Sequence, residues 1–445
     1  MEIEKEYQSA LDFIYSFIDL SLTRNLRYSP DKFNLSRMYR LMSLLGNPQL
    51  NYDIIHVAGT KGKGSICAMT ASILGEAGYK VGFYSSPHMI DFRERIKINK
   101  NEISKESLIF YVMKLRPIFN RVEKISAFEI ITAIAFKYFS DQQVDLAVIE
   151  VGMGGRLDAT NIIQPIVSII SPISHDHMKI LGTTIAKIAK EKAGIIKKSI
   201  PVILSPQKKS AKEVIEKAAK RKGSLIIDTS EKYGFEQINY SLEKQSFIIK
   251  EKIINSPPTS SQIYEIPLLG DHQINNAISA FACIMQLRKL GYEISEKALI
   301  SGFSNVEWPG RFEVIYKEPL IIVDGAHNRD SFRKLKATIK KYLTGEKVIL
   351  IYGASEDKEV KLMLKIISPY IDHFIFTKSE HPRALGISKL EKIALSLDID
   401  NYSTSEIDDI IPIMRRKSNI DKAFITSGSI FIGGAIKQLL ANQEN

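Results

Sequence analysis

The segment 56–65, with the sequence HVAGTKGKGS, constrains the fold of this chain more than any other stretch. A mostly apolar run, residues 54–58, leads into a turn that contains Gly59, Gly62 and Gly64. Glycine tolerates positive backbone φ and lets the main chain approach an anion closely, while the free amides at a helix start attract negative charge. The pattern therefore predicts a strand, a phosphate-binding turn and a helix, which together begin an α/β domain.

The spacing of this segment departs from the general phosphate-loop signature G-x-x-x-x-G-K-[S/T]. Val57 occupies the position of the first glycine, and Gly64 separates Lys63 from Ser65. A glycine-rich turn between a strand and a helix, without a bound phosphate, is compatible with the same residues. The segment alone leaves both interpretations open.

The length and composition indicate a folded protein of two domains. At 445 residues the chain exceeds what one hydrophobic core usually organises. Apolar residues make up 44% and charged residues 25%, which excludes a disordered or fibrous chain. Runs of about eighteen apolar residues are missing and the N-terminus is acidic, so we expect no membrane association and a cytoplasmic location. Cys67 and Cys283 are expected to be reduced and buried.

The net charge of +11 suits anionic partners. The basic residues are scattered along the chain and partly balanced by nearby acids, which favours small anionic ligands over nucleic acid. Charge therefore predicts no nucleic-acid partner.

Predicted strands and helices alternate along most of the chain, which indicates mostly parallel sheets with helices on both faces and ligand sites at the carboxyl ends of the strands. The first series includes strands at 54–58, 80–84, 144–151 and 166–170. Alternating polar and apolar residues at 235–267 predict a small antiparallel excursion, and a helix is expected at 271–290. A second series follows the WPG sequence at 308–310, with strands at 320–323, 347–352, 373–377 and 423–425. We predict an N-terminal domain, 1–306, and a Rossmann-like C-terminal domain, 307–445.

Polar residues follow several of these strands. Glu150 ends a hydrophobic strand and, with a hydroxyl such as that of Ser86, could provide oxygen ligands for Mg²⁺ near a phosphate. A glutamate that ends a strand at the surface is the simpler alternative. The segment SHDH at 174–177, which includes Asp176 and His177, could provide metal ligands or a base or be structural. Lys192 could interact favourably with the C-terminal end of a helix.

The C-terminal half repeats this arrangement with Asp324, His327 and Asn328 in a turn after a strand. Loops in this position often carry function, although Asn328 could equally be the N-cap of the next helix. Arg311 could contact a nucleotide from the junction between domains or be a solvated linker residue.

Motifs distributed over nearly the whole chain carry a family resemblance. In chain order they are LGNP at 45–48, GTKGKGS at 59–65, SPH at 86–88, ERI at 94–96, EVGMGGRLDATN at 150–161, EKAG at 191–194, HQ at 272–273, NA at 276–277, WPGR at 308–311, DGAHN at 324–328 and SGS at 427–429. With these motifs the sequence resembles the folylpolyglutamate synthase and dihydrofolate synthase family of Mur-ligase-like enzymes. Two positions depart from the family pattern, namely Lys61, where Asn is common, and His175, where an aliphatic residue is usual.

The resemblance implies ATP-dependent joining of L-glutamate to a folate or pteroate carboxylate through an acyl phosphate. It implies ATP and two Mg²⁺ ions as ligands, folate or dihydropteroate and glutamate as substrates, and a monomeric enzyme. A peptidoglycan-precursor amino-acid ligase, which shares the chemistry, is the alternative within the fold. A nucleotide-binding switch without catalytic activity is an alternative of another class.

The family motifs also imply roles for individual residues. Those expected at the nucleotide are Gly62, Lys63, Gly64, Ser65, Asn276, Arg311 and Asp324. Those expected at magnesium are Ser86, Glu150, His177 and a carbamylated Lys192. Those expected at the folate or glutamate are Ser126, Phe128, Glu129, Leu157, Asp158, Ala159, His327 and Ser429. The catalytic group would be Lys63, Glu150, His177, Lys192 and His327. Whether such an enzyme makes dihydrofolate, extends folates or does both is not encoded in these motifs.

Overall fold

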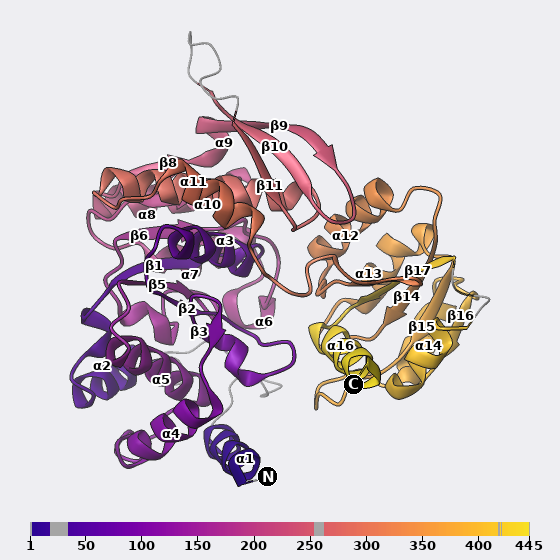
Figure 1. Cartoon of the computed structure of the whole chain (residues 1–445), viewed down its shortest axis with the longest axis horizontal. Coiled ribbons are helices and arrows are strands. Elements are labelled where there is room, and N and C mark those ends of the chain that lie inside the picture. Colours follow the sequence, from indigo (N-terminus) through magenta and orange to yellow (C-terminus); the bar gives the residue numbers. More distant parts are fainter. Residues whose placement is uncertain (1, 18–33, 253–261, 417–418, 420, 445) are drawn as a thin grey trace.

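The computed structural model describes residues 2–17, 34–252, 262–416, 419 and 421–444. Figure 1 shows these residues as a larger lobe, which holds an eight-stranded sheet, and a smaller lobe, which holds a six-stranded sheet. The two-domain α/β class that the sequence predicts is therefore confirmed.

The eight-stranded sheet has the order β4-β3-β2-β5-β1-β6-β7-β8. Its strands are β1 (Asp53–Ala58), β2 (Val81–Tyr84), β3 (Ile96–Ile98), β4 (Asn101–Glu102), β5 (Leu146–Glu150), β6 (Val167–Ile170), β7 (Val202–Leu204) and β8 (Ile226–Asp228). All neighbours pair in parallel except β2 with β3 and β3 with β4. Because β1 lies between β5 and β6, the loops that follow these three strands open at one edge of the sheet.

Helices cover both faces of this sheet. They are α1 (Glu2–Tyr15), α2 (Leu35–Leu44), α3 (Lys63–Glu76), α4 (Lys105–Phe119), α5 (Ala127–Asp141), α6 (Met178–Leu181), α7 (Ile185–Lys192), α8 (Lys209–Lys222), α9 (Thr229–Lys232), α10 (Asp271–Lys289) and α11 (Glu296–Ser304). One core lies around α3, α10 and α11, and a second lies around α1, α2, α4 and α5.

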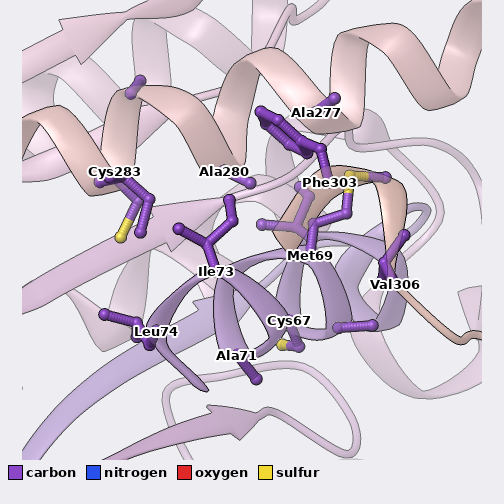
Figure 2. Packing of buried hydrophobic residues seen from close by; sticks show 14 of the residues in the cluster. Cys67, Met69, Ala71, Ile73, Leu74, Ala277, Ala280, Cys283, Phe303 and Val306 are labelled. Atoms are coloured by element: carbon purple, nitrogen blue, oxygen red, sulfur yellow. The ribbon is translucent and has the colours of Figure 1, made fainter. Parts of the chain in front are cut away.

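Helix α3 is buried around nearly its whole circumference, because the sheet covers one side and α10 and α11 cover the other. Figure 2 shows Met69 and Ile73 of α3 close to Ala277 and Ala280 of α10. Small residues on α10 let the two helices approach each other, so the start of α3 is held firmly in place. Cys67 and Cys283 are free and buried in this core, as expected.

The antiparallel excursion is also confirmed. It forms a three-stranded sheet of β9 (Tyr233–Tyr240), β10 (Gln245–Glu251) and β11 (Ile263–Ile266), in the order β11-β10-β9. Residues 253–261 of the predicted segment lie outside the described residues. In Figure 1 this sheet lies over the larger lobe and reaches toward α12 (Arg329–Tyr342) of the smaller lobe.

The six-stranded sheet has the order β12-β13-β17-β14-β15-β16. Its strands are β12 (Glu313–Lys317), β13 (Leu320–Val323), β14 (Lys347–Tyr352), β15 (His373–Phe376), β16 (Tyr402–Thr404) and β17 (Lys422–Ser427). Only β12 pairs antiparallel. Its helices are α12 (Arg329–Tyr342), α13 (Val360–Ile367), α14 (Ile387–Leu395), α15 (Ile410–Met414) and α16 (Ile430–Glu444). One apolar core of this lobe lies around α12, α13 and α14, and another lies around α15 and α16.

The sequence did not predict the short or edge strands β3, β4, β7, β8, β12 and β16. Five of them have only two or three residues, which carry too little periodicity to be recognised, and the longer β12 lies at the edge of its sheet. Within the described part of the chain, the helices are too short or too polar to span a membrane.

Candidate functional site

The loop that joins β1 to α3, together with the first two residues of α3 (59–64 in all), is called the nucleotide loop after its expected ligand. It has the strand, turn and helix geometry that the sequence predicts. Helix α3 begins at Lys63, directly after Gly62, whose φ is +83°. The amides of Thr60 and Lys61 both donate to the carbonyl oxygen of Pro172 at 3.1 Å, which fixes the turn against the loop after β6. The amides of the first turn of α3 therefore point out of the carboxyl end of the sheet, where an anion would be stabilised.

The three glycines of this loop are also required by close packing within the protein. A Cβ on Gly59 would lie 1.7 Å from the Ser171 hydroxyl oxygen. A Cβ on Gly62 would lie 2.3 Å from Oδ1 of Asn276, and one on Gly64 would lie 2.3 Å from the Trp308 ring. The loop is thus in direct contact with α10 and with the segment that leads to the smaller lobe.

Glu150 lies beside the nucleotide loop, at the end of β5. Its Oε1 is 3.5 Å from Nζ of Lys63, and its Oε2 accepts a hydrogen bond from the amide of Ser86 at 3.4 Å. Burial raises the pKa of this carboxyl, while the charge of Lys63 opposes the shift. The alternative of a glutamate exposed at the surface is wrong, because Glu150 is only 4% exposed.

The described residues include no group of three or more His, Cys, Asp or Glu side chains arranged to hold a metal ion. Glu150 and the neighbouring Ser86 nevertheless offer the hard oxygen donors that Mg²⁺ prefers. Magnesium commonly takes one or two protein ligands and completes its shell with water and phosphate oxygens. These residues therefore fit a magnesium ion that binds together with a nucleotide.

Lys192 reaches the same loop from the end of α7. Its Nζ donates to the carbonyl oxygen of Gly59 at 2.6 Å, and burial lowers its pKa to about 7. The end of α7 is held by Arg156, whose guanidinium makes two hydrogen bonds to Glu191 at 3.0 and 3.1 Å. Because the side chain is buried, Lys192 is not a solvated charge at a helix end.

His177 lies immediately before α6 with a φ of +48°, and its side chain is exposed. The preceding Asp176 lies against the smaller lobe, because its Oδ2 accepts a hydrogen bond from Nδ2 of Asn328 at 3.0 Å and is 3.5 Å from Nζ of Lys61. Lys61 is itself nearly buried, which lowers its pKa to about 8. The loop after β6 thus meets both the nucleotide loop and the DGAHN segment.

His327 is a residue of the smaller lobe that contacts the nucleotide loop. Its Nδ1 is 2.8 Å from the carbonyl oxygen of Gly325, and its Nε2 is 3.4 Å from Nζ of Lys61. A neutral imidazole with its proton on Nδ1 satisfies both contacts. The adjacent ammonium and burial hold the pKa of His327 well below its usual value.

Asp324 organises the same turn. Its two carboxylate oxygens accept hydrogen bonds from the amides of Ala326 at 2.9 Å and Phe312 at 3.0 Å. The Arg311 guanidinium lies 5.8 Å from the centre of the Trp308 ring, next to the nucleotide loop. Asn328 is the N-cap of α12, as the simpler interpretation predicted, and also contacts Asp176.

Ser429 follows β17, on the loop beside His327. The amide of the preceding Gly428 donates to the carbonyl oxygen of Ala326 at 2.8 Å, which joins the two loops. His327 and Ser429 therefore lie at neighbouring strand ends of the six-stranded sheet.

The residues expected at the folate side have partners within the protein. Ser126 and Glu129 form the capping box of α5, and Glu129 is also paired with Arg37 at 3.1 Å. Asp158 accepts hydrogen bonds from the amide of Met153 at 2.8 Å and from the hydroxyl of Thr160 at 2.6 Å. Leu157 and Ala159 flank it in the chain.

Phe128 lies against Gly152, where a Cβ would be 2.4 Å from the Phe128 ring. The loop 152–159 therefore links Phe128 to Asp158. Both lie in the larger lobe, which also contains the nucleotide loop. Contact of these residues with a substrate stays a prediction.

Lys358 is a member of the site that was not predicted from the sequence, and Asp176 was noticed only as part of the segment 174–177. Nζ of Lys358 is 3.7 Å from Oδ1 of Asp176. The only sequence signal of Lys358 was its position in a loop after strand β14, which many residues share. Lys61 was noticed as a departure from the family pattern, but its contact with His327 joins residues 266 positions apart and was not predictable.

Comparison with protein families supports a single assignment. Residues 57–284 match the Mur ligase middle domain, and residues 310–429 match the Mur ligase glutamate ligase domain. The chain is 35% identical to a dihydrofolate synthase/folylpolyglutamate synthase of Bacillus subtilis over 420 residues, which are 92% of this chain and 95% of the relative. It is 31% identical to a folylpolyglutamate synthase of Lacticaseibacillus casei, with 98% of both chains covered.

Solved structures agree with this result. The fold matches a folylpolyglutamate synthase of Thermotoga maritima with a TM-score of 0.82 and 32% identity, over 99% of this chain and 98% of that one. It matches a Mycobacterium tuberculosis folylpolyglutamate synthase, complexed with ADP and AMPPCP, with a TM-score of 0.84 and 28% identity over 98% of both chains. The chain therefore belongs to the folylpolyglutamate synthase and dihydrofolate synthase family of the Mur ligases, which are ATP-dependent ligases.

Proposed function

We propose that this protein joins the amino group of L-glutamate to a carboxylate of a folate or of dihydropteroate, with conversion of ATP to ADP and phosphate. The observation that carries the proposal is the meeting of a nucleotide loop from one lobe with the His327 turn of the other, 3.4 Å apart at Lys61. A ligase of this type needs ATP and the amine-bearing substrate in one cleft, and loops from two sheets provide the two sides.

The reaction has two steps. A carboxylate oxygen of the folate substrate attacks the γ-phosphorus of ATP, the bond to the β–γ bridging oxygen breaks, and ADP leaves. The ammonium of Lys63 and the amides at the start of α3 stabilise the charge on the phosphoryl oxygens. The neutral glutamate amine then attacks the acyl carbon, and the bond from carbon to the phosphate oxygen breaks. The amide forms, and the proton lost by the nitrogen leaves with the phosphate as hydrogen phosphate.

The smaller lobe would provide the glutamate. His327, whose Nε2 contacts the Lys61 ammonium beside the nucleotide loop, would help to position the glutamate amino group near the acyl carbon. Ser429, on the neighbouring loop, can donate to a substrate carboxylate. Closure of the two lobes around the reacting groups would exclude water, which would otherwise hydrolyse the acyl phosphate.

Magnesium would be held at two positions, by Ser86 and Glu150 and by His177 and Lys192. When bound, it would neutralise charge on the ATP phosphate oxygens. For Lys192 we propose a carbamate, formed when the neutral amine attacks carbon dioxide and releases a proton, because a carboxylate can bind the ion where an ammonium cannot. The family match and the burial of the side chain beside Gly59 support this assignment.

We propose that the enzyme is a monomer, since one chain provides both sides of the cleft. Sedimentation equilibrium at micromolar protein would give the mass of a single chain, whereas twice that mass would contradict the proposal.

The curated relatives carry the names of folate enzymes, which does not favour a peptidoglycan-precursor ligase.

The deciding experiment measures ADP release with ATP, glutamate and one of three acceptors: dihydropteroate, tetrahydrofolate or a nucleotide-linked muramyl peptide. We expect turnover with one or both of the pterin substrates and identification of the glutamylated product by mass spectrometry. Turnover with the muramyl peptide alone would contradict the proposal. Comparison of the two pterin substrates also decides between dihydrofolate synthesis and extension of folates.

The variant Lys63→Ala tests the nucleotide loop within the same assay. We expect loss of at least about 100-fold in turnover, because a preorganised cation near the transferred phosphoryl group is removed. Lys190→Ala, at an exposed position of α7, is the control. Near-normal turnover of Lys63→Ala would rule out this assignment.

A further inference from the structure

The two lobes contact each other at several places, and for example a Cβ on Gly434 of α16 would lie 2.5 Å from the backbone oxygen of Met89. Two of the contacts are formed by buried or nearly buried hydrogen-bonding groups. One lies between the antiparallel sheet and α12, where the Tyr342 hydroxyl donates to Oε1 of Gln245 at 3.1 Å. Nε2 of Gln245 donates in turn to the carbonyl oxygens of Leu268 and Gly270 at 2.6 and 3.0 Å, and the side chain is fully buried. Because these groups are paired and buried, this contact is a fixed support between the lobes.

The second contact lies at the cleft and converges on one carboxylate. Oδ2 of Asp176 accepts from Asn328 at 3.0 Å and is 3.5 Å from Nζ of Lys61, while Oδ1 is 3.7 Å from Nζ of Lys358. Asn328 and Lys358 belong to the smaller lobe, whereas Lys61 belongs to the nucleotide loop. A single acid of the larger lobe therefore binds two groups of its neighbour.

Lys61 adds a direct bridge. Its ammonium lies between Asp176 and Nε2 of His327, and its amide donates to the carbonyl oxygen of Pro172 in the loop after β6. The side chains of Lys61, Asp176 and Lys358 are only 12%, 11% and 15% exposed, so water and salt screen their interactions less than those of surface pairs.

We infer that Lys61 and Asp176 are positioning residues, which hold the His327 turn of the smaller lobe over the nucleotide loop. With the Gln245 contact as the fixed support, their removal frees the cleft side of the smaller lobe to move away. The imidazole of His327 then loses its fixed position relative to ATP. The kinetic part of this inference rests on the proposed function, whereas the structural part does not.

Distance measurement between spin labels tests the structural part directly. Labels are placed on Lys179→Cys in α6 and Lys361→Cys in α13, which are exposed positions on opposite sides of the cleft. The two native cysteines are buried and should not react. We expect one narrow distance distribution in the labelled parent and a broader, longer one in Lys61→Met and in Asp176→Asn. Lys61→Arg, which keeps the charge, should restore the parent distribution.

Kinetics with the unlabelled protein test the positioning role. Lys61→Met should lower kcat about 10-fold, since small displacements of reacting groups have effects of this size, while the KM for ATP changes less than about 3-fold. Lys61→Arg should recover most of the kcat, and Lys190→Met is the charge-matched control at an exposed position.

Unchanged distance distributions in both Lys61→Met and Asp176→Asn overturn the inference, whatever their activity. Asp176→Asn is isosteric and keeps an acceptor for Asn328, so it remains informative if Lys61→Met folds poorly. If the parent protein itself shows no turnover with either pterin substrate, that result contradicts the proposed function. The measured distances would still decide the structural part.

Discussion

Lys192 lies at the C-terminal end of α7, where a lysine ordinarily interacts with the helix dipole in water. Its chain neighbours give no sign of another role. The fold buries its amine against Gly59 and lowers its pKa to about 7. At the scale of one residue, burial by a distant loop therefore decides the chemistry that a side chain can perform.

Replacement of this side chain tests the carbamate proposal. We expect Lys192→Ala to lose at least about 10-fold in turnover, because the proposed carbamate would supply the carboxylate that positions the metal and ATP. Added short carboxylates such as acetate or propionate should restore part of the activity by filling the space of the carbamate. Turnover of Lys192→Ala that is unaffected by these acids would argue strongly against a carbamate.

At the scale of the element, α3 combines two requirements that its sequence expresses in the same residues. Its first turn must leave amides free for an anion, and its glycines must let Asn276 and Trp308 approach. The glycines appear in the sequence as a phosphate motif, although packing against α10 and the linker requires two of them equally. A glycine pattern therefore reports backbone proximity, whether the neighbour is a ligand or the protein itself.

Two glycine substitutions in α3 test whether close packing, rather than the helix itself, requires glycine. Gly64→Ala should destabilise the protein by about 1–3 kcal/mol, because its Cβ would overlap the Trp308 ring. Gly75→Ala, later in the same helix, places its Cβ at an ordinary 3.7 Å from Asn99 and should stabilise by about 0.5–1 kcal/mol. Chemical denaturation of both variants measures the difference. Equal stabilities would contradict the packing argument.

At the scale of the whole molecule, a ligase cleft forms only because two sheets are placed with their carboxyl ends facing each other. The contact of Gln245 with Tyr342 helps to hold that placement, and so do the contacts of Asp176 with Asn328 and Lys358. The proposed chemistry uses groups from both lobes, so we expect activity to depend on the contacts that hold the lobes together.

The support between the lobes gives a stability prediction. Gln245→Leu should cost about 2–3 kcal/mol, since the buried carbonyl oxygen of Leu268 loses the hydrogen bond from Gln245 and the Tyr342 hydroxyl loses its acceptor. The carbonyl oxygen of Gly270 keeps its hydrogen bond from the amide of Gln273. Tyr342→Phe should cost only about 1 kcal/mol, and Tyr370→Phe, outside this network, should have little effect. Calorimetry of thermal unfolding measures the stability of each variant against that of the parent protein. A Gln245→Leu variant as stable as the parent would show that the support is dispensable.

Prediction from the sequence succeeded where the signal is local. The strand and helix around the nucleotide loop, the four main strands of the smaller lobe and the antiparallel excursion all carry clear periodicity or turn residues. The N-cap role of Asn328 follows from its place before a helix. The boundary at 306/307 stays a prediction, as do the assigned ligand contacts of the site residues.

The sequence by itself determined the α/β class, the order of the motifs and, through them, the family, because these depend on residues that are close along the chain. Only the tertiary structure decided that Lys192 lies against Gly59, that Lys61 reaches His327 and that Asp176 joins the lobes. Such contacts join residues more than one hundred positions apart. They depend on burial and on the placement of two sheets, neither of which any single segment encodes.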